Sequence, residues 1–209
     1  MSDKSEEFTQ LYSLANPLPN ARAKVPVLDV AQGTLVLCES IVIAEYLADE
    51  FGEGSIQPKS SADRARSRLF TELCSNAFSY FPILRVRDDV GKRATALENL
   101  KFSMAGVNDY LTQHGKDDGP FLFGRDFSTA ECIAAPFVQR ACVILPTFCG
   151  PEISPLAICD ELKLSRLSTW IKAVLARPSV SATGVKEPDM VKSVEAMLTR
   201  FAAADNAPR

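Results

Sequence analysis

Apolar residues recur at three- and four-residue spacing over most of the chain, which is the period of an amphipathic helix. The first such segment covers residues 5–15, where Ser5 can cap the helix and Pro17 follows its end. The same spacing returns in the second half of the chain and predicts longer helices there. Their expected ranges are 62–84, 91–114, 128–145, 161–176 and 188–204. The pattern therefore predicts a protein that is mostly helical.

A different pattern lies between the first helix and the longer ones. Residues 25–30 and 34–38 are mostly β-branched or aliphatic, and the short connection between them contains Gly33. Ser40 follows the second run as a helix N-cap, and Gly52 stands just past the end of that helix. The sequence predicts an antiparallel two-stranded hairpin followed directly by a helix.

A change in composition divides the chain after this helix. Residues 53–60 contain glycine, serine and proline and have the composition of a linker. We expect residues 1–52 to form one small domain and residues 61–209 to form an all-helical domain. The predicted fold class is α+β and mostly α, with the hairpin domain packed on the helical one.

Charge and composition exclude several functions. The chain has 209 residues and a net charge of -3, with acidic and basic residues interspersed, so we expect no nucleic-acid partner. No apolar run approaches the roughly 20 residues that cross a bilayer, and the N-terminus lacks the apolar core of a signal peptide. We therefore expect a cytoplasmic protein without membrane contact. Six scattered cysteines and one histidine form no metal-ligand pattern, so no metal is predicted.

Glu39 and Ser40 carry the most specific chemistry in the sequence. A helix N-terminus has unpaired amide hydrogens that attract a carboxylate, and the Ser40 hydroxyl adds a further donor. Glu39 offers a negative charge to an ammonium group, so the pair can hold both ends of an α-amino acid. Pro26 removes a donor from its strand and, if its peptide bond is cis, Val25 could pair with an extended peptide ligand. Each residue also has an ordinary explanation, since serine caps are common and a preceding glutamate is often solvated.

The order of these residues resembles the glutathione transferase family. Its thioredoxin-like domain contains a Val-Pro-x-Leu strand, a second strand and a Glu-Ser-x-x-Ile segment, which match here from Val25 to Ile43. Residues 121–131 are similar to the family's segment before its sixth helix, where Ser128 and Glu131 would form a capping box. A tryptophan-containing helix followed by Arg-Pro-Ser-Val, at 167–180, is a third match. The similarity extends over about residues 5–184 and is greatest to omega-type and related cysteine-dependent members.

This resemblance implies that glutathione is the ligand and substrate. Val25 would pair with the backbone of glutathione, and Pro26 would set the turn of that strand. Glu39 would bind the γ-glutamyl ammonium and Ser40 the adjacent carboxylate. An active member would transfer glutathione to a small electrophile or reduce a glutathione adduct, and the family is commonly homodimeric. Lys4 resembles in position a lysine that contacts glutathione in some omega-type members, although an N-terminal lysine is more often merely solvated.

The sequence departs from the family before Val25. The family's domain begins with a strand, a helix and a second strand, with the catalytic Tyr, Ser or Cys just after the first strand, and such a unit takes about 30 residues. Only 24 residues precede Val25, so we expect the chain to begin partway through the domain, with its catalytic residue unknown. Cys38 could substitute, but neighbouring strand side chains point to opposite faces, so Cys38 should face the core if Glu39 faces the ligand. Both an active glutathione transferase and a catalytically silent protein-interaction module are compatible with the sequence.

Overall fold

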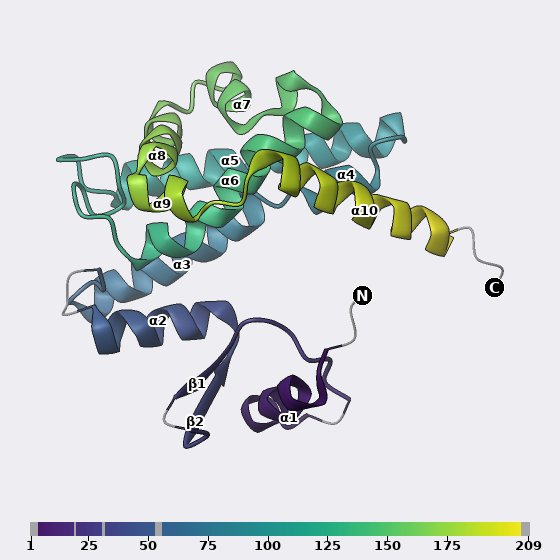
Figure 1. Cartoon of the computed structure of the whole chain (residues 1–209). Helices are drawn as coiled ribbons and strands as arrows, with labels where there is room; N and C mark the ends of the chain where they lie inside the picture. Colours follow the sequence, from purple (N-terminus) through teal and green to yellow (C-terminus); the bar gives the residue numbers. More distant parts are fainter. Residues whose placement is uncertain (1–3, 19, 31, 53–55, 206–209) are drawn as a thin grey trace. The chain divides into compact units, whose positions relative to one another are not determined.

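The computed structural model describes residues 4–18, 20–30, 32–52 and 56–205, with side chains as far as residue 201 (Figure 1). The chain divides into two compact units, residues 1–59 and residues 60–209. Residues 53–55, which belong to the predicted linker, lie outside the described residues, as does residue 31 in the hairpin connection.

The first unit contains a hairpin between two helices. Strands β1 (Val27–Val30) and β2 (Leu35–Cys38) pair antiparallel, as predicted, and Val27 lies opposite Cys38. Helix α1 (Glu6–Ala15) packs against both strands and begins at Ser5, whose hydroxyl accepts a hydrogen bond from the Phe8 amide over 3.2 Å. The hairpin turn is closed by the Gly33 amide, which donates to Asp29 Oδ1 over 2.6 Å.

The start of the following helix differs by one residue from the prediction. Helix α2 (Ser40–Phe51) has Glu39 as its N-cap, because the Glu39 backbone is outside the helical region while its carbonyl already accepts from the Ile43 amide over 3.0 Å. Ser40 is therefore the first helical residue, and the prediction that it is the N-cap is wrong. Gly52 is the C-cap, as expected.

The second unit is all-helical. Helix α6 (Thr129–Cys149) packs against α3 (Ser61–Ala77), α8 (Ser165–Ala176) and α10 (Glu187–Asp205), and α3 also packs against α5 (Val90–His114). Trp170 of α8 is fully buried in the core, where its ring meets Phe70 edge-on with 5.2 Å between centroids and stacks on Phe78 at 6.3 Å. The elements are α3 (Ser61–Ala77), α4 (Phe81–Arg85), α5 (Val90–His114), α6 (Thr129–Cys149), η1 (Pro151–Ile153), α7 (Pro155–Glu161), α8 (Ser165–Ala176), α9 (Pro178–Thr183) and α10 (Glu187–Asp205).

Several predicted helix boundaries are wrong for local reasons. The segment 62–84 is split after Ala77, because Pro82 cannot continue a helix and instead stands in the first turn of α4. Helix α6 continues past Pro146 to Cys149 and is stopped by its C-cap Gly150, whose φ is 113°. The segment predicted from 161 begins later, since Lys163 takes a positive φ between α7 and α8.

Helix α6 is also long and apolar enough, by length and composition alone, to cross a membrane, with 21 residues and a mean hydropathy of 1.5. Its apolar sequence is not continuous over that length, because Glu131 and Arg140 interrupt it. In the structure the apolar residues of α6, among them Ala134, Val138 and Ile144, are buried in the core of the helical unit. The hydropathy of α6 is therefore that of a core helix.

Candidate ligand site at the end of the hairpin

The hairpin register brings the four predicted binding residues to one end of the sheet. Because Val27 lies opposite Cys38 in an antiparallel ladder, Pro26 and Glu39 are the next residues outward on the two strands. Val25 and Ser40 are the positions immediately beyond them. Residues separated by more than a dozen positions in the sequence thus flank the same end of the hairpin.

Glu39 occupies a backbone conformation that is uncommon for a residue with a side chain. Its φ is 69° and its ψ is 116°, a conformation that costs about 1–3 kcal/mol and is often retained at functional sites. The side chain is exposed and makes no capping hydrogen bond to α2. Among the described residues, none forms an ion pair or hydrogen bond with its carboxylate. The carboxylate is therefore available to a cationic ligand group.

The first turn of α2 is open to solvent beside this carboxylate. The Ile43 amide is the first to find a carbonyl within the helix, so the amides of Ser40, Ile41 and Val42 have no intrahelical partner. Ser40 is exposed, and the side chains of Ile41 and Val42 are 40% and 50% exposed. Free amides, a hydroxyl and the positive end of the helix dipole together suit a carboxylate.

Val25 and Pro26 precede β1 and are both exposed. The peptide bond between them is cis. The Val25 side chain is 73% exposed, and in the described part of the chain no group hydrogen-bonds to its backbone. The Val25 amide and carbonyl are therefore free to pair with an extended peptide.

Cys38 lies beside Glu39 but in a different environment. It is half-buried and opposite Val27, whereas Glu39 is exposed. This difference agrees with the alternation of side chains along a strand. Cys38 is therefore the more buried of the two side chains and Glu39 the more accessible to solvent.

Burial makes the cysteines of the helical unit poor nucleophiles. It raises the pKa of Cys142 and of Cys159 to about 12, with a further increase at Cys142 from the charge of Cys159 and at Cys159 from the charge of Asp160. Burial also raises the pKa of Cys74 and Cys149, and that of Cys132, whose side chain is exposed, is raised by partial desolvation and the charge of Glu131. Because of these raised pKa values, the five thiols are protonated at neutral pH. The thiolate is the reactive form, so they are poor nucleophiles. No group of three potential ligands for a metal ion occurs among the described residues.

Ser128 and Glu131 form the predicted capping box at the start of α6. The Glu131 side chain is fully buried, and its Oε2 accepts from the Ser128 amide at 3.0 Å and the Ser128 hydroxyl at 2.8 Å. Its Oε1 accepts from the Leu122 amide at 2.8 Å and from Trp170 Nε1 at 3.2 Å. With both oxygens occupied, Glu131 has a structural role.

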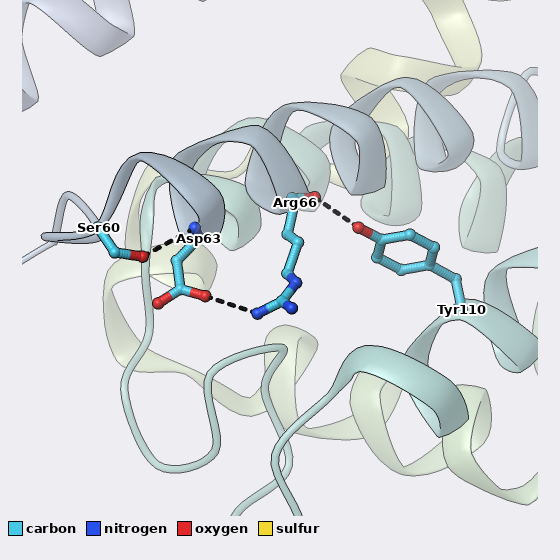
Figure 2. A network of polar contacts seen from close by, with 4 residues as sticks. All are labelled: Ser60, Asp63, Arg66 and Tyr110. Atoms are coloured by element: carbon cyan, nitrogen blue, oxygen red, sulfur yellow. Dashed lines mark hydrogen bonds and ion pairs between the residues drawn. The ribbon is translucent and has the colours of Figure 1, made fainter.

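A second polar network joins the start of α3 to α5 (Figure 2). The Ser60 hydroxyl accepts from the Asp63 amide over 3.0 Å, and Asp63 Oδ1 pairs with Arg66 Nη1 at 3.0 Å. The Tyr110 hydroxyl donates to the Arg66 carbonyl over 3.0 Å. Burial raises the pKa of Tyr110, so its hydroxyl remains a donor. The sequence pattern did not reveal this network, because Tyr110 is 44 positions from its acceptor.

Comparison with known proteins places these features in context, although no family model matches the chain. The glutathione S-transferase-like protein OpS6 of Beauveria bassiana is 25% identical over 167 residues, which are 77% of this chain and 72% of OpS6. Glutathione S-transferase omega-1 of Mus musculus is 28% identical over 163 residues, which are 78% of this chain and 61% of that protein.

A solved structure shows the same relationship. Glutathione transferase Omega 2C of Trametes versicolor aligns with a TM-score of 0.69 and 25% identity, over 93% of this chain and 82% of that chain. Such proteins combine a thioredoxin-like domain with an all-helical domain, so the fold class predicted from the sequence is confirmed.

Proposed function

We propose that this glutathione transferase-like protein binds glutathione at the end of its hairpin, because its sequence relatives and structural neighbours include glutathione S-transferases, among them omega-class members. The observation that carries the proposal is the register, which sets Val25–Pro26 and Glu39–Ser40 side by side. Glutathione has complementary groups, since its γ-glutamyl end carries a free α-ammonium and α-carboxylate on an extended backbone.

Each protein group has one partner in this arrangement. The exposed Glu39 carboxylate binds the γ-glutamyl ammonium through a charge-assisted hydrogen bond. The free amides of the first turn of α2 and the Ser40 hydroxyl bind the adjacent carboxylate. The Val25 backbone, set by Pro26, pairs with the peptide backbone of glutathione as an added strand would. No metal takes part in this binding.

Replacing Glu39 tests the site directly. Glu39→Ala removes the partner of the ammonium, and we expect glutathione affinity, measured by titration calorimetry, to fall about tenfold to hundredfold. N-acetylglutathione lacks the ammonium charge, so its already weaker binding should change little in the same variant. Glu50→Ala is the matched control, because it removes an exposed glutamate from the other end of α2. Equal glutathione affinities for the wild-type protein and Glu39→Ala would disprove the assignment.

For the reaction we propose transfer of glutathione to a small electrophile or reduction of a glutathione adduct. The residue that assists the glutathione thiol is unassigned. The second candidate function is a catalytically silent protein-interaction module. Turnover of an aryl halide or of a glutathione mixed disulfide, lost in Glu39→Ala, would reject the silent alternative.

We further propose a cytoplasmic homodimer, and light scattering tests its oligomeric state.

A further inference from the structure

Lys4 connects the beginning of α1 to the chain just before Val25. Its Nζ donates a hydrogen bond to the Ala23 carbonyl over 2.6 Å, between residues 19 positions apart. The same ammonium lies 4.9 Å from the centroid of the Phe8 ring. Phe8 is itself fixed at the start of α1, where its amide donates to Ser5. The first turn of the helix therefore holds the lysine that reaches the loop.

The loop that accepts this hydrogen bond makes few others. Between residues 22 and 26, all of which the structure describes, it is the one hydrogen bond to another residue, and the sheet ladder begins only at Val27. A segment with so few bonds fluctuates easily, and a ligand that must order it loses affinity. The bond at Ala23 thus restrains the backbone that leads to Val25.

We propose that Lys4 is a positioning residue for glutathione, which holds residues 23–26 in the conformation in which the Val25 backbone can pair with the ligand. This inference rests on the proposed glutathione site. It differs from direct contact between a lysine and glutathione, because the ammonium group is directed to a carbonyl of its own chain. Lys4 acts on the ligand through Ala23 and not through a ligand carboxylate.

Two substitutions separate the hydrogen bond from the bulk of the side chain. Lys4→Met keeps an unbranched chain beside Phe8 but cannot donate, whereas Lys4→Arg retains donors. We expect Lys4→Met to bind glutathione about threefold more weakly than the wild-type protein, and Lys4→Arg to recover most of that loss. Arg22→Met is the matched control, because it removes an equal charge from an exposed neighbour of Ala23 that has no hydrogen-bond or ion-pair partner among the described residues.

Two further measurements isolate the mechanism. The carbonyl carbon resonance of Ala23, recorded without ligand, should move upfield in Lys4→Met and return in Lys4→Arg, because it reports the hydrogen bond itself. Glutathione esterified at its glycine carboxylate should lose the same factor as glutathione in Lys4→Met, since the lysine does not contact that carboxylate.

The possible failures are distinct. An unmoved Ala23 resonance in Lys4→Met overturns the inference, as does unchanged glutathione affinity in this variant while Glu39→Ala still binds weakly. A loss seen with glutathione but absent with its ester would replace the positioning role by direct contact. If the wild-type protein does not bind glutathione at all, the proposed function fails and the role of Lys4 in it fails too.

Discussion

Glu39 and Glu131 both lie at the start of a helix, Glu39 as the N-cap of α2 and Glu131 in the first turn of α6, but their surroundings are opposite. Glu131 is fully buried in the helical unit and accepts hydrogen bonds from Leu122, Ser128 and Trp170. Glu39 in the hairpin unit is exposed, has no partner among the described residues and sits on a strained backbone. The first carboxylate completes a core network, and the second has no partner among the described residues.

The comparison shows how to separate structural from binding residues of the same type. A buried polar group must find its partners within the protein, because an unpaired one costs about 1–3 kcal/mol. An exposed group has no such requirement. The strained backbone and unpaired carboxylate of Glu39 are therefore not explained by a need for internal partners. The two units can therefore be tested by substitutions that affect stability in one and binding in the other.

The largest expected effect is the loss of stability in Glu131→Ala. The substitution leaves the Leu122 and Ser128 amides and Trp170 Nε1 without acceptors in the core, so we expect the free energy of unfolding to fall by about 3–5 kcal/mol. Urea unfolding followed by the fluorescence of Trp170, the single tryptophan, measures it. Glu39→Ala is the control and should change this transition by less than about 0.5 kcal/mol. A loss below about 1 kcal/mol in Glu131→Ala would contradict the structural role.

A second difference between the units concerns their thiols. A pKa of about 12, against 9.0 for an ordinary thiol, leaves Cys142 and Cys159 with very little thiolate at pH 8. We expect iodoacetamide to alkylate them at least about a hundredfold more slowly in the folded protein than in urea, and Cys38 to react much sooner. Mass spectrometry of timed samples identifies the modified residues. Alkylation of Cys142 in the folded protein at its rate in urea would refute the difference.

The same pKa values determine the direction of a pH effect on stability. Both thiols keep their protons in the folded state to about pH 12 but lose them near pH 9 once unfolded. Their contribution to stability is therefore complete below about pH 9 and is lost as the pH rises from there to about 12.

The smallest expected effect separates strain from charge at Glu39. Glycine adopts a φ of 69° easily, so Glu39→Gly should relieve the backbone, whereas Glu39→Ala keeps the strain. We expect Glu39→Gly to be more stable than Glu39→Ala by about 1 kcal/mol, with equally weak glutathione binding in both. Hydrogen exchange of the α2 amides measures the local stability. Equal exchange in the two variants would show that the Glu39 backbone is not strained.

Much of the fold could be predicted from local patterns. Two β-branched and aliphatic runs joined through Gly33 located the hairpin, Ser5 located the start of α1, and Ser128 with Glu131 located the capping box. These features depend on residues close in the sequence. The prediction failed at Ser40, because the backbone conformation of Glu39 makes Glu39 the N-cap. It also failed near Pro82, because this proline divides one continuous apolar pattern into two helices, α3 and α4.

The sequence by itself determined the order of the hairpin and the longer helices, the pairing of the two strands and the residue types available for a γ-glutamyl group, because these follow from spacing and local conformational preference. Only the tertiary structure decided which glutamate is buried and which is exposed. It also placed Trp170 on Glu131 and Lys4 on Ala23. Such contacts join positions far apart in the chain, and their partners depend on how the elements pack, which no short stretch of sequence specifies.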